Sequence, residues 1–118
     1  MYNPKALKRV ELIDKKISFI NNIVLEKGSI EKALEDEQNS RASILMHLIS
    51  IAEQFDKLLQ NGELEILSNF EKEDIKGSYD LRNFIAHDYD GVDLYIVEGV
   101  IKDRLPIILN SCKKILNS

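Results

Sequence analysis

The sequence predicts an all-α protein, an antiparallel bundle of four to five helices, and three observations support this prediction. Apolar residues recur at steps of three and four along most of the 118-residue chain, which is the spacing of one buried helix face. No segment alternates apolar and polar residues as a half-buried strand does. Residues that end or cap helices stand between the periodic segments. The length fits one domain, which we assign to residues 1–118.

The first expected helix covers residues 6–27. Pro4 stands where a helix start tolerates proline, and Gly28 stands where a left-handed residue ends a helix. Ser29 is a good N-cap for a short second helix over residues 30–35. The apolar stripe of the first helix consists of Leu7, Val10, Ile13, Ile17, Ile20 and Val24.

A long helix is expected next, with Asn39 or Ser40 as its N-cap and Gln60 near its end. Asn61 and Gly62 then stop it. Its apolar side consists of Ile44, Leu45, Leu48, Ile51, Ala52, Phe55 and Leu59.

The segment after this helix is harder to assign. Residues 63–69 fit either one helical turn or an extended connection. Ser68 and Glu71 have the spacing of a capping box, but Gly77 is expected to interrupt any helix that begins there. A helix is therefore expected at least over residues 79–86.

The C-terminal part reads as a turn followed by one more helix. Residues 88–91 have turn composition, and Asp93 is the expected N-cap of a helix that runs to about Leu116. Pro106 lies inside this helix and removes one backbone hydrogen bond, so a kink is expected there. The apolar stripe consists of Val97, Ile101, Leu105, Ile108, Cys112 and Ile115.

Composition limits the class of protein. A net charge of −4 argues against a protein whose whole surface attracts nucleic acid, although screening beyond about 8–10 Å leaves room for a local basic site. Cys112 is the one cysteine, and we expect a small buried thiol and no metal site. There is no apolar signal segment and no run near the ~20 apolar residues of a membrane span, so a cytoplasmic location without membrane contact is expected.

Residues 82–89 hold the polar cluster best suited to chemistry. Histidine can transfer a proton near neutral pH, and arginine keeps its charge and forks onto phosphate oxygens. Arg82 and His87 therefore suit cleavage of an RNA phosphodiester, in which the 2′-hydroxyl of the substrate attacks. Tyr89 could stack on a base or bind phosphate through its hydroxyl. From spacing alone, two other readings stay open: helix-end caps and a non-catalytic binding site.

The spacing of the two residues raises a geometric question. If the helix continues through His87, Asn83 and His87 share a face, but Arg82 and His87 lie about 140° apart. A direct partnership of Arg82 and His87 within one chain needs the helix to end or tighten near Ala86. The alternative is that a second copy of the chain completes the site.

The segment Arg82-Asn83-x-x-x-His87-x-Tyr89 matches the R-x4-H-x-Y motif, and the chain resembles the HepT-like toxins of the HEPN superfamily. The residues after the motif resemble the family pattern G-V-D-x-x-I-V…L-P: Gly91-Val92-Asp93, Ile96-Val97 and Leu105-Pro106. Upstream, Ile51-Ala52-Glu53-Gln54 resembles the I-G-E-A segment of the long middle helix. The resemblance covers about residues 5–117.

This resemblance implies a HEPN-like helical bundle, a homodimer whose two motifs face one cleft, and a metal- and cofactor-independent endoribonuclease that acts as the toxin of a toxin–antitoxin pair. Arg82 and His87 would be catalytic, with Asn83 and Glu53 in support; Glu53 would orient Arg82 from the neighbouring helix. The family's antitoxin is an MntA-like minimal nucleotidyltransferase, which adds AMP to the tyrosine that corresponds to Tyr89. The alternative is a non-catalytic nucleotide- or substrate-binding partner of such an enzyme.

His47 and a group of N-terminal cations are the other polar features of the sequence. His47 stands between Met46 and Leu48, and we expect a solvent-facing or packed histidine. The N-terminal segment carries five basic residues, which we expect to form a solvated face, with a contribution to RNA or antitoxin binding as the alternative. These residues are Lys5, Lys8, Arg9, Lys15 and Lys16.

Overall fold

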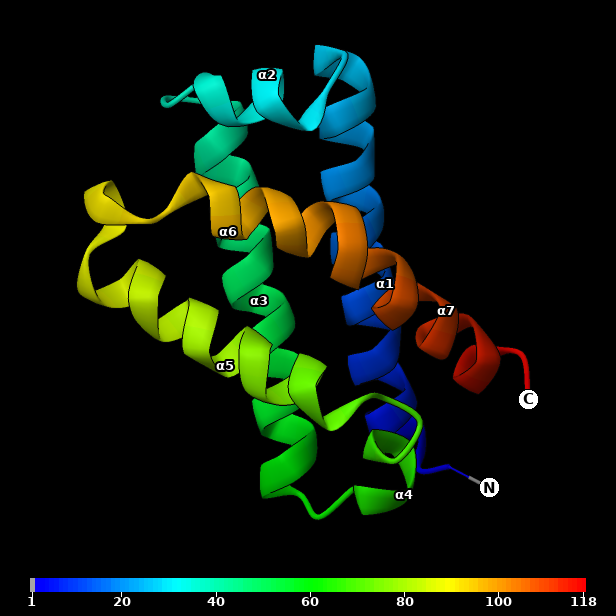
Figure 1. The fold of residues 1–118 in the computed structure, drawn as a ribbon. Coiled ribbons are helices and arrows are strands. Elements are labelled where there is room, and N and C mark those ends of the chain that lie inside the picture. Colours follow the sequence, from blue (N-terminus) through cyan, green and yellow to red (C-terminus); the bar gives the residue numbers. More distant parts are fainter. Residues whose placement is uncertain (1) are drawn as a thin grey trace.

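The computed structural model describes residues 2–118, and the helices in them form two layers (Figure 1). In one layer, α1 (Pro4–Lys27) and α3 (Ser40–Gln60) pack side by side and antiparallel. In the other, α5 (Lys72–His87) crosses α3, and the C-terminal α7 (Leu105–Leu116) packs on α1. No strand occurs in this part of the chain. The prediction of an all-α antiparallel bundle is confirmed.

Where α1 ends and α3 begins, the helix boundaries and caps agree with those predicted from the sequence, with one exception. Gly28 adopts φ 99° at the end of α1, and Ser29 accepts a hydrogen bond from Lys32 N–H at the start of α2 (Ile30–Glu35). The N-cap residue of α3, Asn39, makes no side-chain capping bond. Instead, the Asp36 carboxylate accepts hydrogen bonds from the Asn39 N–H and the Ser40 hydroxyl.

The interruption predicted at Gly77 does not occur. After a short α4 (Leu64–Leu67), α5 begins at Lys72 and runs through Gly77 without a break. A glycine inside a helix costs only about 0.5–1 kcal/mol relative to alanine. Burial of Leu81 and Ile85 on the same helix offsets that cost.

The capping box expected before α5 is also absent. The Ser68 hydroxyl donates to the Glu65 carbonyl oxygen at 2.6 Å instead of capping the next helix. The N-cap of α5 is Glu71, whose side chain makes no capping bond.

The C-terminal helix contains a wide turn. Asp93 caps α6 (Leu94–Gly99) through its Oδ1, which accepts from Tyr95 N–H at 2.9 Å, as predicted. A π-helical turn, η2 (Val100–Arg104), then joins α6 to α7, and Pro106 lies in the first turn of α7. The sequence predicts a kink at Pro106; the structure places the irregular turn directly before it, where π turns commonly bend helices.

The core follows the predicted stripes with small shifts. Leu59 was expected inside but is 54% exposed, and Leu58 is buried in its place because α3 meets the start of α1 on that side. Phe55 and Phe70 pack edge to face, with ring centroids 5.0 Å apart. Cys112 is buried as predicted, and burial raises the pKa of its thiol to about 12. Among residues 2–118, no helix is long and apolar enough to cross a membrane.

Candidate active site

The motif residues lie at the C-terminal end of α5. Leu81 and Ile85 are buried and hold this end of the helix against the core. Arg82 and His87 are exposed, and Asn83 is half-buried between them. Tyr89 follows in a single 3-10 turn, η1 (Tyr89–Gly91), and is also exposed. The predicted catalytic and modification residues therefore lie within reach of solvent.

The helix neither ends nor tightens before His87. The Asp88 N–H donates to the Phe84 carbonyl oxygen at 3.1 Å, which is the four-residue bond of a regular α-helix. Arg82 and His87 consequently project about 140° apart. Within the described residues, the recorded side-chain partner of Arg82 is Asn83, with Arg82 Nη1 3.4 Å from Asn83 Oδ1. One chain alone does not bring the arginine and the histidine together.

The motif nevertheless lies on one broad exposed face of α5. Tyr79 precedes Arg82 by three residues and Asn83 by four, and it precedes His87 by eight. At these steps Tyr79 lies between the other two side chains, about 60° from Arg82 and about 80° from His87, so the three span an arc of about 140°. Tyr79, Arg82 and His87 are all exposed. This face combines a cation, an imidazole and an aromatic ring, and exposed Asp80, seven residues before His87, borders it on the histidine side.

The turn after the motif uses the carboxylate that the sequence places beside His87. Asp88 Oδ1 accepts a hydrogen bond from Gly91 N–H at 3.1 Å, and so does the Asp88 carbonyl oxygen. A Cβ atom at Gly91 would lie 2.1 Å from Asp88 Oδ2. Gly91 therefore has to remain without a side chain for the Asp88 carboxylate to close the turn that carries Tyr89.

Glu53 does not contact Arg82 in this chain. It lies on the exposed side of α3, although its neighbour Ala52 is buried. No ion pair or hydrogen bond between Glu53 and Arg82 is recorded in residues 2–118. The supporting roles of Glu53 and Asn83 both stay predictions, and of the two only Asn83 contacts Arg82 in the described residues.

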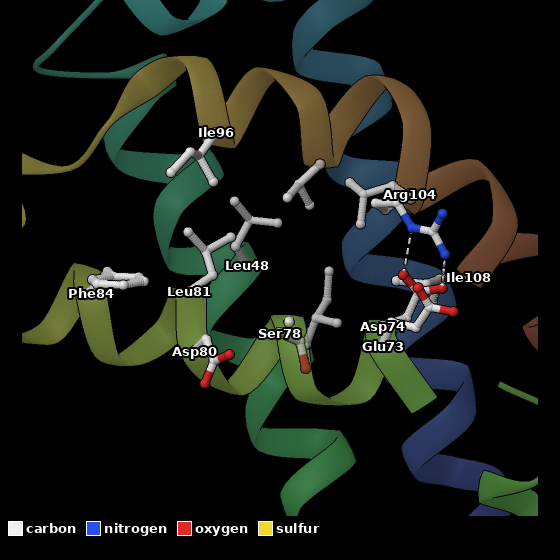
Figure 2. A pocket seen from close by; sticks show the side chains of 14 residues that line it. Leu48, Glu73, Asp74, Ser78, Asp80, Leu81, Phe84, Ile96, Arg104 and Ile108 are labelled. Carbon is white, nitrogen blue, oxygen red and sulfur yellow. Dashed lines mark hydrogen bonds and ion pairs between the residues drawn. The ribbon is translucent and has the colours of Figure 1, made fainter. Parts of the chain in front are cut away.

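A mainly apolar groove of about 400 Å³ runs between α5 and the α6–α7 segment, with α3 as its floor (Figure 2). Leu81 of α5 and Ile96 of α6 point toward each other across it, and Leu48 of α3 lies between them. At its open end Phe84 is 63% exposed and Ile96 is 52% exposed. Arg82 and His87 do not line this groove. Phe84 projects about 160° from Arg82, so the groove and the arginine lie on opposite sides of α5.

The other end of the groove is closed by an ion-pair cluster that sequence reasoning missed. Arg104 of the π turn forks onto Asp74, with distances of 2.7 Å and 2.9 Å (Figure 2). It also donates to the Glu71 carboxylate. These hydrogen bonds, first to Asp74 and then to Glu71, raise the pKa of Arg104 above its usual range. Asp74 is only 6% exposed. The cluster fixes the start of α5 against the π turn.

A sequence signal for this cluster does exist. Asp74 precedes the buried Leu81 by seven residues and so falls on the buried stripe of α5. A carboxylate on such a stripe needs a partner. The identity of that partner is not a local property, because Arg104 lies 30 residues away.

Comparison with known proteins gives the family. Residues 11–115 match the model of the HepT-like family, described as ribonuclease HepT-like. The chain belongs to the HepT-like ribonuclease family. No curated protein and no solved structure matches this chain. The match of residues 11–115 to the family model confirms the family assignment made from the motif. Within residues 2–118, no cluster of His, Cys, Asp and Glu side chains is arranged to hold a metal ion.

Proposed function

We propose that this HepT-like protein is a metal-independent endoribonuclease toxin whose active site combines Arg82 and His87 in a homodimer cleft. One observation carries the proposal: α5 exposes the arginine and the histidine of the R-x4-H-x-Y motif to solvent, in a chain that belongs to a ribonuclease family. This exposed position suits a polymeric substrate better than an enclosed pocket would.

The chemistry needs one proton-transfer group and one fixed positive charge. The 2′-hydroxyl oxygen of the RNA attacks the adjacent phosphorus, and the bond from phosphorus to the 5′-oxygen breaks. His87 accepts the proton of the 2′-hydroxyl or returns one to the leaving 5′-oxygen. Arg82 forks onto the phosphate oxygens and stabilises the charge that develops there. The chain's own residues supply both functions, with no cofactor in the reaction.

A second copy of the chain supplies what one chain lacks. The regular end of α5 holds Arg82 and His87 about 140° apart, which is too far around the helix for both to reach one phosphate directly. A twofold dimer presents the same face of α5 from each protomer, so Arg82 of one can meet His87 of the other. Exposed Phe84 and Ile96, on the side of α5 away from Arg82, provide apolar surface that a partner protomer can cover.

Regulation fits an MntA-like nucleotidyltransferase antitoxin that acts in the cytoplasm. Tyr89 is exposed in η1, two residues beyond His87, so another enzyme can reach its hydroxyl. AMP on Tyr89 adds a negative phosphate and a base beside the cation that is to bind RNA. Repulsion and bulk would then exclude the substrate.

Cleavage of RNA by the purified protein in the presence of EDTA tests the proposal. Arg82→Ala and His87→Ala should each abolish cleavage, and because both side chains are exposed, helix content and melting temperature should stay nearly unchanged. Lys102→Ala, an exposed change on the π turn, is the matched control and should cleave like the wild type. Cleavage by both motif variants would refute the assignment. A wild type that never cleaves RNA but is AMP-labelled on Tyr89 would favour the non-catalytic partner instead.

A further inference from the structure

Five cations line one side of α1, the side that faces away from the core. They occupy an arc of about 120° on the helix and extend over about 16 Å of its length. Within residues 2–118, the four lysines of this set form no ion pair with a carboxylate. The residues are Lys5, Lys8, Arg9, Lys15 and Lys16.

The acidic residues of the same stretch point elsewhere. Glu11 and Asp14 project outside the basic arc of the helix. Asp14 pairs with Lys113 of α7 at 2.9 Å, on the side of α1 where α7 packs. The basic arc is therefore not neutralised by its own helix.

The neighbouring side of α3 extends this surface without adding negative charge. Arg9 Nη1 donates to Gln54 Oε1 at 3.1 Å, and Phe19 packs on His47, so these two contacts align α1 with one face of α3. That face consists of residues at steps of three and four, none of them acidic: Ser43, His47, Ser50, Gln54, Lys57 and Asn61. Two acidic residues stand at its edges: Glu53, three residues after Ser50, and Glu63, which lines a hollow with Lys5 and Lys8.

An aromatic pair lies at one end of the cations. The Phe19 ring is 5.3 Å from the His47 ring, centroid to centroid, and Phe19 is 36% exposed. Lys15 Nζ and Lys16 Nζ lie 5.7 Å and 5.8 Å from the centre of the Phe19 ring. Burial, and secondly the charge of Lys16, lower the pKa of His47. Both ammonium groups lie over the ring as cation–π contacts. Sites for single-stranded nucleic acid combine such cations, which contact phosphates, with an exposed aromatic ring on which a base stacks.

We propose that this α1–α3 face is a second RNA-binding surface, on which the five cations contact phosphates of single-stranded RNA and Phe19 with His47 stacks on a base. The choice of RNA as the ligand rests on the proposed ribonuclease function. Because α3 lies between α1 and α5, the surface is separate from the motif and holds RNA that flanks the cleavage point. The exposed ring among the cations favours RNA over an acidic protein, which would pair with the lysines but has no base to stack on Phe19.

Salt dependence of binding measures the phosphate contacts. Affinity for a fluorescent, single-stranded 2′-O-methyl RNA, which cannot be cleaved through its 2′-oxygen, is measured by anisotropy at several salt concentrations. Each phosphate contact to single-stranded nucleic acid contributes about −0.7 to the slope of log K against log salt concentration. Lys8→Gln/Lys15→Gln should therefore weaken binding and reduce the slope by about 1.4. Lys102→Gln/Lys114→Gln changes the net charge equally, on exposed lysines outside this surface, and should keep the wild-type slope.

Stacking is tested by a variant that keeps the charge. Phe19→Leu preserves an apolar side chain against His47 and should raise the Kd at least about fivefold with the slope unchanged. Equal binding by the wild type, Lys8→Gln/Lys15→Gln and Phe19→Leu refutes the surface, even if the wild type cleaves RNA. If the wild type binds RNA without cleaving it, and the variants bind RNA more weakly, the binding surface is supported and the ribonuclease function is refuted. Loss of nucleotidyltransferase binding with RNA binding intact identifies an acidic protein as the occupant and overturns the inference.

Discussion

Chains carrying Arg82→Ala and chains carrying His87→Ala should restore ribonuclease activity when they are combined in one dimer. Each variant alone lacks one of the two groups in every active site. The regular end of α5 keeps Arg82 and His87 on different sides of the helix, with no contact between them in the described residues. If the arginine of one protomer works with the histidine of the other, a mixed dimer contains one complete pair.

The size of the recovery follows from dimer symmetry. Random pairing of equal amounts of the two variants makes about half of the dimers mixed, and each mixed dimer has one complete site out of two. The mixture should thus show about one quarter of wild-type activity per chain. Mixed dimers purified through two different affinity tags should show about one half.

The assay is RNA cleavage in EDTA by co-expressed, differently tagged chains, with native mass spectrometry to count mixed dimers. Arg82→Ala mixed with untagged Arg82→Ala is the control, because it reproduces the handling without creating a complete pair. Mixed dimers of the two variants that are formed and yet inactive would show that both groups have to come from one chain, and the argument from the helix geometry would fail.

Three further predictions concern the turns and the core. Arg104→Met should lower the melting temperature by leaving the buried Asp74 carboxylate unpaired, and Asp74→Leu/Arg104→Met should recover much of the loss, because an apolar pair can replace a buried ion pair; thermal denaturation followed by circular dichroism measures both. Gly91→Ala should displace the Asp88 carboxylate from the turn and speed hydrogen exchange of the backbone amide at residue 91, with helix content unchanged; unchanged exchange contradicts the turn geometry. Cys112 should react with a thiol reagent at pH 8 only after unfolding. Because the folded pKa of about 12 lies above the ordinary pKa of 9.0 for a cysteine thiol, the unfolded state loses its proton first. This thiol should therefore lower the free energy of unfolding as pH rises from about 9 to 12, measured by urea denaturation against Cys112→Ala.

The parts of the fold that the sequence predicts well are those set by local spacing. The α1 stripe, the stop at Gly28 and the cap at Asp93 depend on neighbours within one or two turns, and the structure contains all three. Gly77 misled because its local preference is outweighed by the burial of Leu81, which a propensity argument does not include.

The sequence predicts only part of the candidate site. The motif residues and their place at a helix end follow from the sequence, and so does the angular separation of Arg82 and His87, whereas their exposure comes from the structure. The Arg104–Asp74 cluster joins positions 30 residues apart, and the exposure of Phe84 depends on how α6 packs over α5. Both depend on tertiary packing, so the local pattern marks Asp74 as a buried carboxylate but does not identify Arg104 as its partner.

The π turn at Val100–Arg104 makes the surface beside the motif depend on chain length. A π turn contains one residue more than an α turn, so α6 and α7 are offset by one position from a continuous α-helix. Deleting one residue there would rotate α6 by about 100° relative to α7. Ile96 would then leave the groove opposite Leu81, although every side chain of the groove would still be encoded. A single-codon deletion in this turn would thus alter the groove between α5 and α6 more than most substitutions of the residues that line it.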